Sequence, residues 1–250
     1  MLTTADELYR SLPRVSNSDL TRLKEEHLGY GDANTAGRAT AERAKVFGRA
    51  FHQHLLEPES IGMVMHQLLP DLTPAPTALE PTQASQLAML MDTIRKDPFC
   101  RRYLRQSERE RVVLSTDPAT GVPCKARLDM VHTSPKRRKA LIIDIKMTAA
   151  CTPAQFLESC YTYDYDRQAA FYLDSLRFAD SGEWADTQQF NVVFIGMMKQ
   201  QPHRLFAIDT TSIPGFIEYG RKKYRFWLRK WREEQEGHRL VQTPAWQRSA

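Results

Sequence analysis

The sequence contains few cysteines, and none is placed as a metal or redox motif requires. Its four cysteines stand at positions 100, 124, 151 and 160, with no CxxC pair and no neighbouring histidine cluster. The sequence therefore does not favour a zinc finger, an iron–sulfur cluster of common spacing or a thioredoxin-like redox motif. We expect buried, reduced thiols, as in a cytoplasmic protein.

Long apolar runs and glycine-rich phosphate loops are also missing. No apolar run approaches the roughly 20 residues of a membrane-spanning helix, and the N-terminal segment lacks the apolar stretch of a signal peptide. There is no GxGxxG and no P-loop. We therefore expect a soluble, cytoplasmic protein without a membrane partner, and no doubly wound nucleotide-binding fold.

The composition is that of a folded chain with a modest excess of positive charge. Hydrophobic residues make up 42% of the 250 residues, and the formal net charge is +5. Segment 221–232 carries seven of the 35 basic residues and no acid. As a helix it would present an aromatic stripe, which we interpret as core. Its basic face either follows a DNA backbone or is merely solvated, and we favour DNA.

Hydrophobic periodicity predicts helices first, then a β-meander, then helices and strands in alternation. The expected helices cover residues 4–28 in two pieces, 40–57, 83–96, 99–107, 153–178 with an interruption near Tyr163, and 213–236; the expected strands cover 109–115, 123–132, 140–146, 189–198 and 203–209. This order predicts an α/β (α+β) fold with a mixed central sheet flanked by helices. We treat 1–250 as one domain, with a helical part (1–107), a catalytic sheet (108–210) and a basic helix (211–236).

Two carboxylates and a lysine are expected to meet at the end of an apolar strand. Asp144 and Lys146 share one face of the strand because side chains alternate, and a hairpin through 133–139 would bring Asp129 beside them. Carboxylates, with the carbonyl of Ile145, are the ligands that Mg²⁺ or Mn²⁺ prefers. A D-x-K triplet alone, however, more often marks an ordinary surface ion pair.

Further residues occur in a familiar order around this triplet. Gly48-x-x-x-His52 precedes the meander, Glu110 opens its first strand, and Gln168-x-x-x-Tyr172 follows on a helix. With Asp129 and Asp144-x-Lys146, the chain resembles the PD-(D/E)xK nuclease superfamily, in its RecB-like branch. The likeness is greatest to RecE-type exonucleases (exodeoxyribonuclease VIII). It extends from about residue 15 to 178, and Met147-Thr148 replaces the usual Thr-Thr.

The resemblance implies a restriction-endonuclease-like core that hydrolyses DNA phosphodiesters with Mg²⁺, for which Mn²⁺ can substitute. Asp129, Asp144, the Ile145 carbonyl and His52 would be metal ligands. Lys146 would orient or deprotonate the water, or stabilise the phosphorane.

The other motif residues are assigned to the surroundings of the metal. Glu110 would bind a second metal or hold a ligating water, with Glu108 as the competing first acid. Gln168 and Tyr172 would contact DNA or steady the lysine and carboxylates, although either could be ordinary packing, as could His52. Lys125 and Arg127 could hold phosphate, but strand-surface charge explains them equally well.

The family likeness also implies partners. These are double-stranded DNA ends degraded 5′→3′ in recombination or phage DNA processing, a ring-like homo-oligomer, and a single-strand annealing protein. Two alternatives stay open: a structure-specific or restriction-type endonuclease on the same core, and a non-catalytic protein that binds DNA ends.

Overall fold

The computed structural model describes residues 5–29, 35–56 and 79–242 of the chain. Its helices are α1 (Ala5–Ser11), α2 (Asn17–His27), α3 (Thr35–Leu56), α5 (Pro81–Lys96), α6 (Pro98–Gln106), α7 (Pro153–Thr162), α8 (Tyr165–Arg177) and α9 (Phe216–Gln242). Its strands are β1 (Glu108–Thr116), β2 (Pro123–Ser134), β3 (Lys139–Thr148), β4 (Gln189–Met198) and β5 (Leu205–Asp209). The expected elements are confirmed, with ends shifted by a few residues. No described helix is long and apolar enough to cross a membrane.

The five strands form one mixed sheet in the order β1-β2-β3-β4-β5. The pairs β1–β2, β2–β3 and β4–β5 are antiparallel, whereas β3 and β4 are parallel. A parallel pair needs a crossover, and here α7 and α8 supply it. The expected mixed sheet is therefore confirmed, and β1 is one of its two edge strands.

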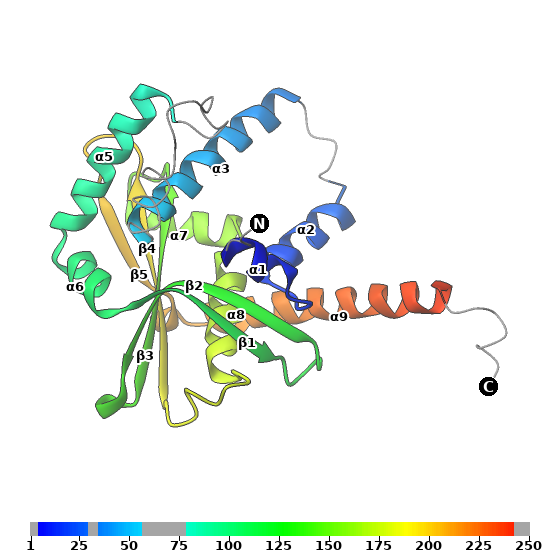
Figure 1. Ribbon diagram of the computed structural model, residues 1–250. Helices are drawn as coiled ribbons and strands as arrows, with labels where there is room; N and C mark the ends of the chain where they lie inside the picture. The colour runs from blue at the N-terminus through cyan, green and yellow to red at the C-terminus, as the bar shows by residue number, and fades with distance from the viewer. Residues whose placement is uncertain (1–4, 30–34, 57–78, 243–250) are drawn as a thin grey trace, which may run out of the picture.

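Helices cover both faces of the sheet, as Figure 1 shows for α5 and α6 on one side and α8 and α9 on the other. The first core holds Phe51, Leu90 and Ile94 from the helices, packed against Ile143 and Ile145 of β3. The second core is built by side chains of α2, α7, α8 and α9 against the opposite face. Strand β3 thus buries Ile143 and Ile145 on one side and turns Asp144 and Lys146 to the other.

The break between α7 and α8 lies where the sequence predicted an interruption. Asp164 adopts a left-handed conformation with φ of 54°. Its carboxylate forms ion pairs with Lys24 of α2 at 2.5 Å and with Lys223 of α9 at 2.9 Å. Ion pairs offset part of the strain of this conformation, and they join three helices at one point.

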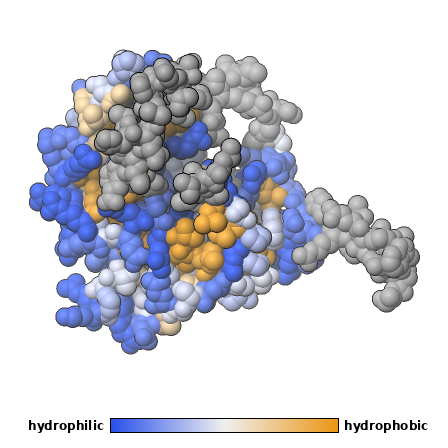
Figure 2. All heavy atoms as spheres, viewed as in Figure 1, coloured by the Kyte–Doolittle hydropathy of each residue, from blue (hydrophilic) through white to orange (hydrophobic). Residues whose placement is uncertain are grey.

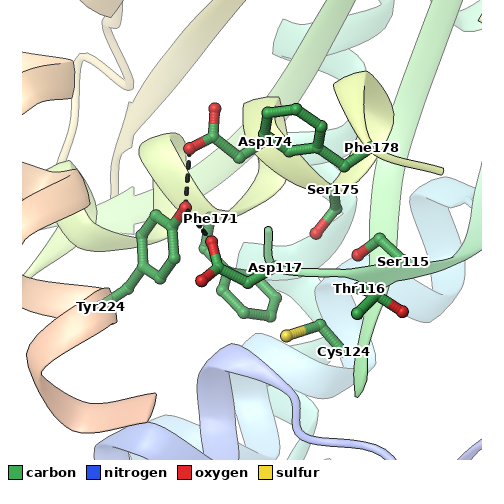
Figure 3. Close-up of a pocket in the computed structure, with 9 residues that line it drawn as sticks. All are labelled: Ser115, Thr116, Asp117, Cys124, Phe171, Asp174, Ser175, Phe178 and Tyr224. Atoms are coloured by element: carbon green, nitrogen blue, oxygen red, sulfur yellow. Dashed lines mark hydrogen bonds between the residues drawn. The ribbon is translucent and has the colours of Figure 1, made fainter. Parts of the chain in front are cut away.

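Helix α9 lies close against α8, and one glycine makes this contact possible. A Cβ atom at Gly220 would lie only 1.9 Å from the carbonyl oxygen of Asp166. Further along α9, the hydroxyl of the buried Tyr224 lies 2.7 Å from Asp174 and 3.1 Å from Asp117 (Figure 3). The cavity beside these groups has a volume of only about 10 Å³ and holds no more than a water.

Four of the basic residues of α9 serve this packing. Arg221 makes a two-pronged contact with Asp174 at 2.6 and 2.9 Å, and Lys223 and Arg225 pair with buried aspartates. Arg232 donates to the carbonyl of Thr120 at 2.9 Å. The aromatic stripe is core, as expected. Arg221, Lys223 and Arg225 thus have a structural role, because buried carboxylates must be paired. A DNA contact of the remaining basic face stays a prediction.

The remaining surface is largely polar. Figure 2 shows a mostly hydrophilic face with one compact hydrophobic area near its centre. Among the described large apolar side chains, those most exposed are Tyr163, Leu8, Tyr219 and Leu28. They lie on different elements, and single exposed apolar residues are normal for a soluble fold.

Candidate active site

Asp129 and Asp144 lie opposite each other on neighbouring strands. The β2–β3 register pairs Met130 with Ile143, and the two aspartates are the next residues along it. The backbone N–H of Ile145 donates to Oδ2 of Asp129 across 3.4 Å. Both carboxylates line one cavity of about 290 Å³. The expected pairing of these acids is therefore present in the structure.

Lys146 lies in the same cavity, two residues beyond Asp144 on β3. Its Nζ is 2.8 Å from Oδ1 and 3.0 Å from Oδ2 of Asp144. The rings of Tyr165 and Phe194 lie 4.9 and 5.7 Å from the same Nζ. Burial lowers the pKa of Lys146, but the charge of Asp144 and further neighbours outweighs it and leaves a net rise. Lys146 is thus a buried, oriented cation.

His52 reaches the carboxylates from helix α3. Its Nδ1 lies 3.2 Å from Oδ2 of Asp129. Burial lowers the pKa of His52, but the charge and hydrogen bond of Asp129 raise it by more. Burial likewise raises the pKa of Asp129, and His52 and Lys146 bring it below its ordinary value. Each of the two groups thus favours the charged form of the other.

Asp144 differs from its neighbour in its electrostatics. Only 1% of its surface is exposed, and burial together with the charge of Asp129 raises its pKa, in spite of Lys146. Its Oδ1 lies near the lysine but accepts no hydrogen bond of good geometry. A buried carboxylate oxygen without a full set of donors is unfavourable, and a cation would relieve it.

Glu110 rather than Glu108 faces this cavity. Within the β1–β2 pairing, Glu110 stands across from Asp129, and its Oε2 lies 3.0 Å from Nε of Arg127. Glu108 instead pairs with Arg111 at 3.2 Å, outside the residues that line the cavity. The structure thus places Glu110, and not Glu108, at the site.

The backbone is distorted where Glu110 meets Asp129. Glu110 has a φ of 50°, which costs of order 1 kcal/mol or more for a residue other than glycine. At the same level of β2 the side-chain alternation reverses, since Leu128 and Met130 pack into opposite cores. A regular strand would place both on one side. Strain of this kind concentrates at functional sites.

Gln168 and Tyr172 cover the cavity from helix α8. Their i, i+4 spacing places both on one face, and Gln168 Nε2 donates to Tyr172 Oη at 2.8 Å. Burial, with the nearby charges of Asp144 and Asp129, raises the pKa of Tyr172 well above its ordinary value. Tyr172 therefore keeps its proton and can donate a hydrogen bond into the site.

Lys125 and Arg127 are held by other parts of the chain. Lys125 is 5% exposed, and its Nζ donates to the carbonyls of Tyr9, Arg10 and Leu12 at 3.0, 3.1 and 2.9 Å. All three of its donors are thereby used at the end of α1, so the structure replaces the expected phosphate contact with a structural role. Arg127 is paired with a carboxylate and lies 5.2 Å from the ring of Tyr9.

Several further residues that line the cavity were not predicted from the sequence. Tyr9 of α1, Asn17 and Ser18 at the start of α2, and Arg49 of α3 belong to this group. Arg49 precedes His52 by three residues, so helical spacing alone could have indicated it. For Tyr9 no local pattern signals the site, because its position depends on contacts far apart in the sequence.

The donor set fits a hard divalent cation. Carboxylate oxygens, a neighbouring backbone carbonyl and an imidazole are the ligand types that Mg²⁺ and Mn²⁺ accept. Over the described ranges, no three side chains of His, Cys, Asp or Glu already have the spacing of a closed metal site. The ammonium of Lys146 lies against one side of the Asp144 carboxylate.

Comparison with known proteins places this geometry in a family. Residues 25–239 match the family described as a PDDEXK-like domain of unknown function (DUF3799). The chain belongs to this family. The predicted membership of the PD-(D/E)xK nuclease superfamily is thereby confirmed, and such nucleases generally use divalent metals. The finer likeness to RecE-type exonucleases stays a prediction.

Solved structures support the fold. A candidate exonuclease from Eubacterium rectale superimposes with a TM-score of 0.60 at 15% identity, covering 88% of this chain and 81% of that one. The structure of SSO0001 gives a TM-score of 0.29 at 14% identity over 83% and 84% of the two chains, too low to support an argument. No protein of curated function matches the sequence.

Proposed function

We propose that this protein is a divalent-metal-dependent deoxyribonuclease that uses Mg²⁺, with Mn²⁺ as a substitute. One observation carries the proposal: Asp129, Asp144, Lys146 and His52 converge in a single cavity, in which Asp144 is fully buried. Burying three or four charges together costs several kcal/mol unless they serve each other or a ligand. Membership of a nuclease superfamily supplies the reaction class.

Each residue takes a role that its contacts allow. Asp129, Asp144, His52 and the carbonyl of Ile145 would hold the cation, which lowers the pKa of a water and neutralises charge on the leaving oxygen. Lys146 would stabilise the charge that builds up on the phosphate, or would orient or deprotonate the attacking water. Its contact with Asp144 and the flanking rings keep that ammonium in place.

The surrounding residues support this arrangement. Glu110 would hold a second cation or a ligating water beside Asp129, while Arg127 orients its carboxylate. Gln168 orients Tyr172, whose hydroxyl proton can be donated to a phosphate oxygen or to an aspartate. Contacts of this outer kind commonly tune metal affinity and activity.

We further propose that the substrate is a double-stranded DNA end, degraded 5′→3′ as an exonuclease. The fold similarity to a candidate exonuclease and the likeness to RecE-type enzymes support this assignment. A ring-like homo-oligomer, a single-strand annealing partner and a role in recombination or phage DNA processing follow from the same likeness. An endonuclease on the same core remains the second candidate, because both reactions use the same residues.

Purified protein incubated with linear duplex and with nicked circular duplex in Mg²⁺ tests the proposal. We expect degradation of the linear substrate only, earlier release of a 5′ label than of a 3′ label, and loss of activity in Asp144→Ala. Cutting of circular duplex would favour the endonuclease. Binding of ends without cleavage by wild-type protein would favour a non-catalytic end-binding protein.

A further inference from the structure

Four arginines surround one depression outside the catalytic cavity. Arg95 of α5, Arg101 and Arg105 of α6, and Arg109 of β1 line it, together with Leu55 and Leu104. Its volume is about 270 Å³. All four arginines are exposed, and none of the described residues that line the depression is acidic. We call this group the arginine cluster.

In the part of the chain that the structure describes, the arginine cluster lacks the internal partners that most other cations have. Within residues 5–29, 35–56 and 79–242, none of its four guanidinium groups has a side-chain hydrogen bond or an ion pair. By contrast, Arg111 pairs with two glutamates, and Arg221 and Arg225 pair with buried aspartates. The cluster is thus distinct from the structural arginines.

Its arrangement is also unfavourable for the chain by itself. Arg101 and Arg105 stand at i, i+4 on one face of α6, where like charges destabilise a helix by roughly 0.2–0.5 kcal/mol. Arg95 and Arg109 add two further positive charges to the same depression. An anionic ligand would turn this repulsion into attraction, and guanidinium groups bind phosphate oxygens in two-pronged fashion.

The depression adjoins the catalytic cavity along two elements. On β1, Arg109 of the cluster directly precedes Glu110 of the cavity. On α3, Leu55 lines the depression and His52 lines the cavity, about 4.5 Å apart along the helix axis at the usual rise. Since β1 is an edge strand, an extended ligand can pass around this edge of the sheet from the catalytic cavity to the depression.

We propose that the arginine cluster binds backbone phosphates of the DNA whose scissile bond lies in the catalytic cavity. This inference rests on the proposed function. The ligand class is the phosphodiester backbone, because the described residues of the lining offer guanidinium groups and two leucines but no aromatic ring or amide to read a base. The contact is therefore independent of base sequence and sensitive to salt.

The double variant Arg101→Gln/Arg105→Gln tests the proposal. A matched control, Lys136→Gln/Arg137→Gln, removes two exposed positive charges from the turn between β2 and β3. The affinity of each protein for a fluorescent duplex is measured in EDTA across a series of salt concentrations. All four substituted side chains are exposed, and a thermal melt of each variant checks the fold.

Each phosphate contact contributes about 0.9 to the slope of log affinity against log salt, so two lost contacts lower the slope by about 1.8. Between 50 and 200 mM salt, wild-type protein should then lose about 12-fold more affinity than the double variant. The control should keep the wild-type slope. An unchanged slope in the arginine variant would overturn the proposal, as would an equal change in the control, which reports net charge alone.

A second measurement separates this inference from the proposed function. Hydrolysis of bis(p-nitrophenyl) phosphate with Mn²⁺ uses the catalytic cavity without a DNA backbone. We expect the arginine variant to hydrolyse it at the wild-type rate while it degrades linear duplex more slowly. Failure of wild-type protein to hydrolyse either substrate would sink the proposed function, whereas the salt slope in EDTA would still decide on the arginine cluster.

Discussion

Replacing Tyr224 by phenylalanine isolates one buried hydroxyl that joins α9 to α8 and β1. The ring is 1% exposed and packs edge-on against Phe171 at 5.7 Å, and the substitution keeps these contacts. Only the bonds to Asp174 at 2.7 Å and to Asp117 at 3.1 Å are lost. Tyr224→Phe therefore creates no cavity, and its effect on stability reports the hydroxyl.

The magnitude follows from counting protons. A tyrosine hydroxyl carries one proton and can donate it to one carboxylate at a time. A hydrogen bond to a charged acceptor contributes about 1.5–3 kcal/mol, so we expect a loss of about 2 kcal/mol rather than twice that. Both aspartates keep other donors, since Arg221 holds Asp174 and Thr120 holds Asp117.

Urea denaturation of wild-type protein and Tyr224→Phe measures this loss. For a chain of this size it corresponds to a fall in Tm of about 4–8 °C. Tyr219→Phe, on the same helix with its residue 53% exposed, is the control and should change stability by less than about 0.5 kcal/mol. A loss below about 0.5 kcal/mol in Tyr224→Phe would refute the assigned hydrogen bond, and one above about 4 kcal/mol would refute the one-proton argument.

Four further outcomes are expected. Lys146→Ala should leave DNA binding largely intact and lower turnover by at least about tenfold, because it removes transition-state charge; an unchanged rate in a single-turnover assay would contradict its role. His52→Ala should raise the metal concentration needed for half-maximal activity. An unaltered metal titration would show that His52 serves only in packing. With a thiol reagent at neutral pH, exposed Cys151 should react first and the other three only on unfolding, since burial raises each of their pKa values to about 12; more than one fast thiol would contradict this. Burial raises the pKa of Asp164, but hydrogen bonds from Lys24 and Lys223 lower it overall. The difference in free energy of unfolding between wild-type protein and Asp164→Asn should therefore be constant above about pH 5 and shrink as pH falls below about 4. A difference that grows in acid would contradict this assignment.

Much of the site was predictable from sequence because its signals are local. Asp144 and Lys146 share a strand face, and Gln168 and Tyr172 share a helix face, as the periods of the two elements require. The interruption near Tyr163 also follows from the local pattern. These features depend on neighbours within four residues, which periodicity captures.

Other assignments needed the folded structure because they depend on partners far along the chain. Lys125 looks like any alternating strand lysine, and only the docking of α1 turns its ammonium onto three carbonyls. The two glutamates at the start of β1 cannot be told apart by spacing, since a left-handed residue disturbs the alternation there. Sequence periodicity assumes regular backbone, and strained backbone is where it fails.

The distribution of positive charge shows the same division. By itself the sequence determined the order of elements, the mixed sheet and the acids that belong to one site, because these follow from periodicity and motif spacing. It drew attention to the dense basic run of α9, whereas the tertiary structure gave most of those cations buried aspartates or carbonyls. Only the fold brought Arg95, Arg101, Arg105 and Arg109 together, with no ion-pair partner among the described residues, since two helices and a strand had to pack before four separate charges could face one depression.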